Sequence, residues 1–220
     1  MSISSPVSLR VLELMASRIC HDLISPISAI NNGLELFEEL GPDAGDEVTD
    51  LISFSAKTSA SKLQIMRFAY GAGGNDPSLR PGEVFKAFEI FFGGDRKVEL
   101  TVPSPDRQMP LMGQPSINRI LACVLFYANE CMPRGGKIDI MCDVDTLTFN
   151  IEGIDEGLWE KAKNKIQLEQ VSEDADELDP KTIHPYVTGL FLRTHGYGFD
   201  LEMQGDKKAC IKIQMPDVTE

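Results

Sequence analysis

The chain has 220 residues, of which 42% are hydrophobic and 25% are charged, and its formal net charge is −13 at pH 7. This composition is typical of a globular protein with a buried core, and the negative charge argues against binding a nucleic-acid backbone, which depends on Lys and Arg. No run approaches the roughly 20 apolar residues that cross a bilayer, and the N-terminus lacks a charged segment followed by an apolar one. We therefore expect a cytoplasmic protein with no membrane or nucleic-acid partner.

The first 40 residues predict one long amphipathic helix, because apolar residues recur at helical spacing from Leu9 to Leu40. On a wheel of about 100° per residue, one set of apolar residues shares an arc of about 80°. This set consists of Leu12, Ile19, Leu23, Ile27, Ile30 and Leu34. Residues 41–46, which contain glycine and proline, break the helix, and a second apolar stripe runs from Val48 to Met66. Residues 1–72 are therefore predicted to form a helical hairpin.

A hairpin of this kind cannot bury both flanks of its apolar stripes by itself. Two hairpins side by side enclose a common core as a four-helix bundle. We therefore expect a homodimer that is held together by residues 1–72. The alternative is that the hairpin docks on the second domain of its own chain.

The rest of the chain predicts a second domain with a mixture of helices and strands. Residues 71–77 are rich in glycine and predict a flexible linker, and the second domain is assigned to residues 73–220. Helices are predicted at 83–92, 116–132, 158–167 and 185–194, and strands at 97–102, 137–143, 147–152, 198–203 and 209–215. This order indicates a two-layer α/β sandwich, so that the fold class of the whole chain is α+β.

Of the histidines, His21 is the one with a position suited to chemistry. Its place on the wheel is about 160° from the centre of the apolar arc, so it points to solvent. A lone exposed histidine is usually an ordinary surface residue, so a chemical role for His21 depends on the residues around it. His184 and His195 have no metal-ligand or triad partner at a recognisable spacing, and we interpret both as structural. The cysteines are scattered and form no CxxC pair, which predicts neither a disulfide framework nor a zinc site.

The residues after His21 give it a chemical context. A carboxylate such as Asp22 beside an imidazole fixes the tautomer in which one nitrogen carries the proton and the other can attack phosphorus. Ser25 lies one turn later on the same face, where it leaves room for a phosphoryl group and can bond to it. Pro26 removes the amide that would bond the carbonyl of Asp22, and we expect a bend just past His21. The candidate catalytic residues are His21, Asp22 and Ser25.

The run from His21 to Pro26 resembles the H-box of the dimerization and phosphotransfer domains of two-component histidine kinases. That motif reads histidine, acidic residue, two residues, small polar residue, proline. The resemblance implies that His21 accepts a phosphoryl group and that receiver domains dock beside it. Arg18, one turn earlier, is expected to attract the phosphoryl group or an acidic receiver site. The expected receiver contacts are Arg18, Ile24, Ser25 and Ser28.

The order of elements after the hairpin resembles the ATP-binding catalytic domain of histidine kinases, but its motifs are defective. If residues 133–136 match the family's proline-x-glycine-glycine, Tyr127 stands where that family binds Mg²⁺ through asparagine. Gly153 replaces the adenine-binding aspartate, Asp155 replaces the first glycine of the same motif, and only Gly157 remains. The lid corresponds to residues 169–179, whose carboxylates would repel a triphosphate. We therefore expect that the nucleotide site is lost.

A phosphorylation hairpin joined to a catalytic domain that cannot hold ATP resembles the ChpT-type histidine phosphotransferases of alphaproteobacteria, over nearly the whole chain. The resemblance implies a homodimer that takes phosphate from the receiver domain of a hybrid histidine kinase, CckA in that family. It implies that the phosphate then passes to the receiver domains of response regulators such as CtrA and CpdR. It also implies that the protein needs no cofactor of its own, because the receiver would bring Mg²⁺.

Two other interpretations remain open at this point. One is an active histidine kinase with divergent ATP motifs, which ATP binding would reveal. The other is a noncatalytic dimeric scaffold in which His21 is an ordinary surface residue, and such a scaffold would acquire no labile phosphate from any donor. We favour a phosphotransfer protein over an ATP-dependent kinase because of the substitutions at Tyr127 and Gly153.

Overall fold

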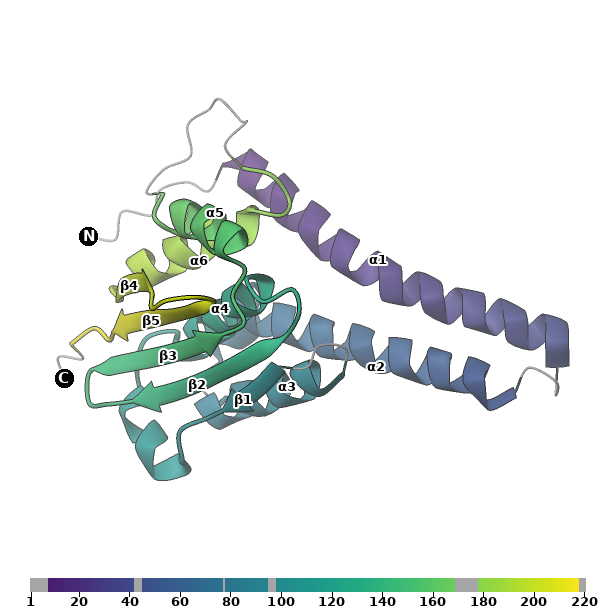
Figure 1. Cartoon of the computed structure of the whole chain (residues 1–220), viewed down its shortest axis with the longest axis horizontal. Coiled ribbons are helices and arrows are strands. Elements are labelled where there is room, and N and C mark those ends of the chain that lie inside the picture. Colours follow the sequence, from purple (N-terminus) through teal and green to yellow (C-terminus); the bar gives the residue numbers. More distant parts are fainter. Residues whose placement is uncertain (1–7, 42–44, 77, 95–97, 169–177, 218–220) are drawn as a thin grey trace.

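The computed structural model describes residues 8–41, 45–76, 78–94, 98–168 and 178–217. A long helical hairpin, α1 and α2, extends from a body in which helices cover one face of a sheet (Figure 1). The elements are α1 Leu9–Leu40, α2 Gly45–Ala69, η2 Ala72–Asn75, α3 Pro81–Gly94, β1 Val98–Thr101, η3 Pro105–Leu111, α4 Ile117–Glu130, β2 Gly136–Cys142, β3 Thr146–Glu152, α5 Glu156–Ile166, α6 Ile183–Thr194, β4 Gly198–Met203 and β5 Lys208–Gln214. The structure thus confirms the α+β class.

The bounds of α1 agree with the prediction, because both ends carry local signals. The Ser8 hydroxyl accepts a hydrogen bond from the Val11 amide at 3.3 Å and caps the first turn. Gly41 follows the last turn with φ of 58°, a left-handed value that favours glycine. α2 is longer than predicted and continues to Ala69, where it enters the core of the body.

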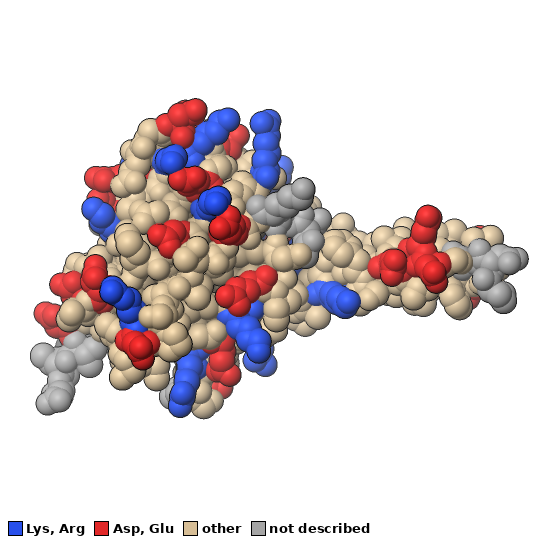
Figure 2. Space-filling view, turned by 60° about the horizontal axis from the view of Figure 1, so that its bottom comes forward, with Lys and Arg blue, Asp and Glu red and all other residues tan. Residues whose placement is uncertain are grey.

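Within one chain, the predicted apolar stripe of α1 is only partly buried. α2 instead packs against a neighbouring face of α1, where a Cβ added to Gly33 would come within 2.6 Å of the Ile52 side chain. Three residues of the stripe, Leu12, Ile27 and Leu34, remain 56%, 46% and 48% exposed. In Figure 2 the hairpin is a narrow projection with few charged side chains except near its tip. The hairpin therefore presents an apolar flank to solvent.

The base of the hairpin is packed firmly on the body. Val11 and Leu14 of α1 share a small buried cluster with Leu178 and with residues of α6. Residues 71–77 end α2 as predicted, but the described residues 71–76 are packed on the body, which the expected flexibility did not anticipate. Residues 72–75 form the 3-10 helix η2, Gly74 is buried, and Arg119 donates to the Gly71 carbonyl at 2.8 Å. Glycine permits this close approach of the chain to α4, where a side chain would collide.

The sheet has the order β1-β2-β3-β5-β4 and is antiparallel except for the parallel pair β1 and β2. Alternate residues of β2 and β3 are buried, so that one sheet face packs on helices and the other meets solvent. This confirms the two-layer arrangement. α4 is buried over almost its whole length, and its C-terminal residue, Glu130, lies at the base of the hairpin beside α1. None of the described helices has the length and apolarity needed to cross a membrane.

Candidate functional site

His21 lies on the outer side of α1, as predicted, with 82% of its side chain exposed. Its Nδ1 atom is 3.3 Å from Oδ1 of Asp22. If Nδ1 carries the proton and donates it to this carboxylate, Nε2 keeps a free lone pair and faces solvent. The geometry therefore suits an imidazole nucleophile whose reaction partner approaches from solvent.

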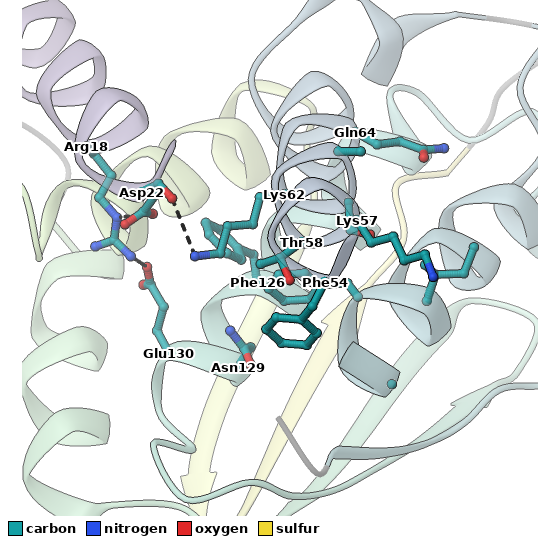
Figure 3. A pocket seen from close by; sticks show the side chains of 15 residues that line it. Arg18, Asp22, Phe54, Lys57, Thr58, Lys62, Gln64, Phe126, Asn129 and Glu130 are labelled. Atoms are coloured by element: carbon teal, nitrogen blue, oxygen red, sulfur yellow. Dashed lines mark hydrogen bonds and ion pairs between the residues drawn. The ribbon is translucent and has the colours of Figure 1, made fainter. Parts of the chain in front are cut away.

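Asp22 is held by a pair of salt bridges that connects α1 with α4. Nε of Arg18 donates to the second carboxylate oxygen, Oδ2 of Asp22, at 2.8 Å, while Nη2 of Arg18 donates to Oε1 of Glu130 at 2.5 Å. Nη1 of Arg18 donates to the Pro180 carbonyl at 3.2 Å. Burial lowers the pKa of Arg18, but the charges of Glu130 and Asp22 outweigh it, so that the pKa lies above its ordinary value. Figure 3 shows Arg18 directed at Glu130.

The backbone carbonyl that Pro26 leaves without its helical amide has a hydrogen-bond partner on the other helix of the hairpin. Pro26 has no amide to bond the carbonyl of Asp22, four residues earlier. Nζ of Lys62, on α2, donates to that carbonyl oxygen at 3.4 Å (Figure 3). The backbone carbonyl that the proline leaves without its helical amide therefore has a partner on the neighbouring helix, one residue after His21.

The other predicted site residues divide between the surface and the interior. Ser25, Ile24 and Ser28 are exposed beside His21, and Ile24 exposes 61% of its surface. The side chain of Arg18 is only 16% exposed and is engaged in the contacts just described. Sequence reasoning expected Arg18 to face a receiver domain, whereas the structure engages its side chain with Asp22 and Glu130. It also missed Lys62 and Glu130, which lie 40 and 112 positions from their partners.

A cavity of about 550 Å³ lies between the hairpin and the body, behind Asp22. Its polar lining includes Lys57 and Lys62 from α2, and its apolar wall includes Phe91 and Phe126. Figure 3 shows the cavity among helices α2, α3 and α4, with Asp22 at its edge. Residues 19–66 contain no Lys or Arg besides these two lysines. Both lysines of this stretch thus line the cavity, which Asp22 also lines.

The two other histidines occupy positions unlike that of His21. His184 is fully buried, with Nε2 3.0 Å from the Cys123 carbonyl and Nδ1 2.5 Å from the Tyr70 hydroxyl. Burial lowers the pKa of His184 to about 3, and the positive charge of Arg18 acts in the same direction. His195 caps the C-terminus of α6 and is half-buried. Both positions agree with structural roles.

The residues at the kinase-like nucleotide motifs are used for packing. Tyr127 is fully buried and its ring contacts the buried Trp159, with 5.7 Å between ring centroids. Gly153 has φ of 98°, and a Cβ there would come within 2.5 Å of the Gly135 carbonyl oxygen, so this turn has no space for an aspartate. Asp155 caps α5 by accepting a bond from the Leu158 amide.

The acidic lid predicted at residues 169–179 falls largely outside the described residues; Leu178 is buried, and Asp179 accepts bonds from the amides of Lys181 and Thr182. Within the described part of the chain, no group of three or more His, Cys, Asp or Glu side chains is arranged to hold a metal ion.

The chain is similar in sequence to histidine phosphotransferases and in structure to a bacterial phosphotransferase. The family described as histidine phosphotransferase C-terminal domain matches residues 81–207. Protein phosphotransferase ChpT of Brucella abortus (strain 2308) is 30% identical over 198 residues, which cover 88% of this chain and 91% of that protein. A solved structure of a bacterial phosphotransferase matches with a TM-score of 0.71 and 25% identity, covering 97% of this chain and 100% of the other. A histidine kinase, AdeS of Acinetobacter baumannii, covers 90% of this chain and 98% of its own with a TM-score of 0.42 and 13% identity.

Proposed function

The chain belongs to the ChpT-type histidine phosphotransferases, and from this premise we propose that it carries a phosphoryl group between receiver domains on His21. The donor is the phosphorylated receiver of a hybrid histidine kinase, and the recipients are receiver domains of response regulators. The observation that carries the proposal is the exposed imidazole with Asp22 at 3.3 Å from Nδ1. This arrangement leaves Nε2 free for a partner protein.

The proposed reaction moves one phosphoryl group in two balanced steps. The Nε2 lone pair of His21 attacks phosphorus in the aspartyl phosphate, the phosphorus–oxygen bond breaks, and the aspartate carboxylate leaves with its electron pair. The ring becomes positively charged with its proton still on Nδ1, where the Asp22 carboxylate stabilises it. In the second step a carboxylate of the next receiver attacks phosphorus, and the electron pair of the phosphorus–nitrogen bond returns to Nε2.

The surface around His21 is suited to a docked protein. Ile24 and Ser28 are exposed along the same helix and would contact the receiver, while Ser25 lies one turn from His21 and would bond to the phosphoryl group or leave it space. Residues 23–34 carry no charge, so that a receiver meets little charge repulsion there. Arg18 joins these contacts through the small part of its side chain that is exposed and otherwise supports Asp22.

We further propose a homodimer that is formed by the hairpins. Leu12, Ile27 and Leu34 lie on the flank of α1 that α2 leaves half-exposed. A second hairpin would cover this flank and complete a four-helix bundle. Burial of such side chains supplies about 25 cal/mol per Å² of apolar surface.

The second domain is proposed to act without ATP. The side chain of Tyr127 packs against Trp159 in the core, and the turn at Gly153 has no space for the carboxylate that would bind adenine. The protein then supplies position and a nucleophile, while the receiver brings the Mg²⁺ that neutralises the transferred group. No cofactor of its own is needed.

The proposal is tested by two incubations of the purified protein. With ³²P-labelled receiver domain of the donor kinase, the full chain should become labelled. With labelled ATP alone it should not, because the reaction needs a phosphorylated receiver. Labelling by ATP alone would favour the active-kinase interpretation, and no labelling in either incubation would favour the scaffold.

A further inference from the structure

We infer that Glu130, in the second domain, is a positioning residue for His21 and acts through Arg18 and Asp22. The inference rests on the proposed function, since it gives a further residue a role in the chemistry of His21. It also assigns a task to a domain whose kinase motifs are defective. Glu130 lies at the C-terminal end of α4, and α4 is fixed in the core of that domain.

A continuous series of charged contacts connects Glu130 with the imidazole. Oε1 of Glu130 is 2.5 Å from Nη2 of Arg18, Nε of Arg18 is 2.8 Å from Oδ2 of Asp22, and Oδ1 of Asp22 is 3.3 Å from Nδ1 of His21. The side chains of Glu130, Arg18 and Asp22 are each 16% exposed, whereas that of His21 is 82% exposed. The series therefore begins in a sheltered position and ends at the surface where a receiver would bind.

Arg18 would hold Asp22 poorly if it had only the helix to orient it. In an isolated helix, a base that precedes an acid by four residues is the less favourable order of such a pair. A free arginine side chain also carries about 2 kcal/mol of rotamer entropy. Glu130 and the Pro180 carbonyl each take one terminal nitrogen of the guanidinium, which leaves Nε directed at Asp22. The second domain thus fixes the orientation of the planar guanidinium, and the guanidinium in turn orients Asp22.

The charges in this series also bear on the tautomer of His21. Two acids share the positive charge of Arg18, so Arg18 does not neutralise Asp22 completely. The pKa of Arg18 lies above its ordinary value despite burial, in agreement with a strong field from both acids. Oδ1 of Asp22 remains available to accept the Nδ1 proton of His21, and this fixes the tautomer with a free Nε2.

Two measurements on the full chain test the inference, and the first does not depend on any partner protein. Nitrogen-15 NMR of the imidazole reports which nitrogen of His21 carries the proton. In the wild type the Nδ1-protonated tautomer should dominate, and in Glu130→Gln its share should fall. Glu152→Gln is the matched control, because Glu152 is an exposed residue of β3 whose salt bridge is with Lys208 of β5 and not with the hairpin. This control should leave the tautomer unchanged.

The second measurement is the rate of phosphoryl uptake from the labelled receiver. Glu130→Gln should slow uptake by about tenfold, a size that misplacement of a reacting group can produce. If Glu130 acts through Arg18, the double variant Arg18→Ala/Glu130→Gln should be no slower than Arg18→Ala alone. Circular dichroism and thermal unfolding of each variant show whether the fold is retained.

An unchanged tautomer in folded Glu130→Gln would overturn the inference. So would a double variant that takes up label more slowly than Arg18→Ala by the full factor seen for Glu130→Gln alone. If the wild type takes up no label while Glu130→Gln still shifts the tautomer, the proposed function fails and the positioning role stands. If the wild type is labelled and Glu130→Gln matches it in both measurements, the proposed function stands and the positioning role fails.

Discussion

Nζ of Lys62 on α2 donates to the main-chain carbonyl of Asp22 on α1 at 3.4 Å. This is the carbonyl that Pro26 leaves without its helical amide. A proline inside a helix costs about 3 kcal/mol, and the cost is reduced where a neighbouring group bonds the carbonyl. The motif around His21 therefore depends on both helices of the hairpin, although its sequence lies within α1.

Removal of the Lys62 amino group should weaken this motif. Lys62→Met is expected to lower the free energy of unfolding by about 1 kcal/mol, because the Asp22 carbonyl loses its partner. Denaturant unfolding measures this change. Lys57→Met is the matched control: Lys57 lines the same cavity, and its loss changes the charge equally without touching Asp22. Equal destabilisation by both substitutions would mean that the charge of the cavity matters and that the hydrogen bond does not.

The proposed dimer predicts that one charge on the half-exposed flank of α1 will separate the two hairpins. Ile27→Glu should convert the full chain from dimer to monomer at tens of micromolar, because a carboxylate in the bundle core loses its hydration without gaining a partner. Sedimentation velocity measures the change. Val144→Glu replaces an apolar residue that is 86% exposed on the β2–β3 turn and should leave the dimer intact. A wild-type chain that is monomeric under these conditions would contradict the four-helix bundle.

Restoring the kinase-type asparagine should damage the second domain and leave ATP unbound. Tyr127→Asn removes a buried ring from its contact with Trp159 and should cost about 3 kcal/mol of stability. Tyr127→Phe is the control and should stay close to wild type, because among the described residues the Tyr127 hydroxyl has no hydrogen-bond partner. Calorimetric titration with millimolar ATP should give no saturation for any of these proteins. Saturable binding would show that the nucleotide site survives.

The sequence was most informative where the physical signals are local. Periodicity alone predicted α1 from Leu9 to Leu40 and the outward position of His21, and the structure confirms both. The contacts of Arg18 were not predictable in this way, because Glu130 comes beside it only after α4 packs against the hairpin. The linker was misjudged for a similar reason. Glycine content reports conformational freedom, and it does not reveal that Arg119 holds the segment against α4.

Burial of His184 predicts a loss of stability in acid. Its pKa is about 3 in the folded chain and 6.5 as the ordinary value, so between these pH values the unfolded chain binds the proton and the folded chain does not. Stability from this group is therefore complete above pH 6.5 and is lost as the pH falls towards 3. The unfolding free energy of the wild type should drop more steeply with decreasing pH than that of His184→Gln, by up to about 1.4 kcal/mol per pH unit. Equal slopes in denaturant titrations would contradict the buried neutral imidazole.

The central claim is that His21 is the residue that carries the phosphoryl group, and the most direct measurement locates the label after incubation with a phosphorylated receiver. The bound phosphate should be stable in alkali and lost in acid, as expected of a phosphorus–nitrogen bond and opposite to an acyl phosphate. His21→Ala should abolish uptake, Asp22→Asn should slow it by about 10²-fold, and folded His184→Gln and His195→Gln should take up label at the wild-type rate. Uptake by His21→Ala at the wild-type rate would contradict the account and leave His21 as an ordinary surface residue.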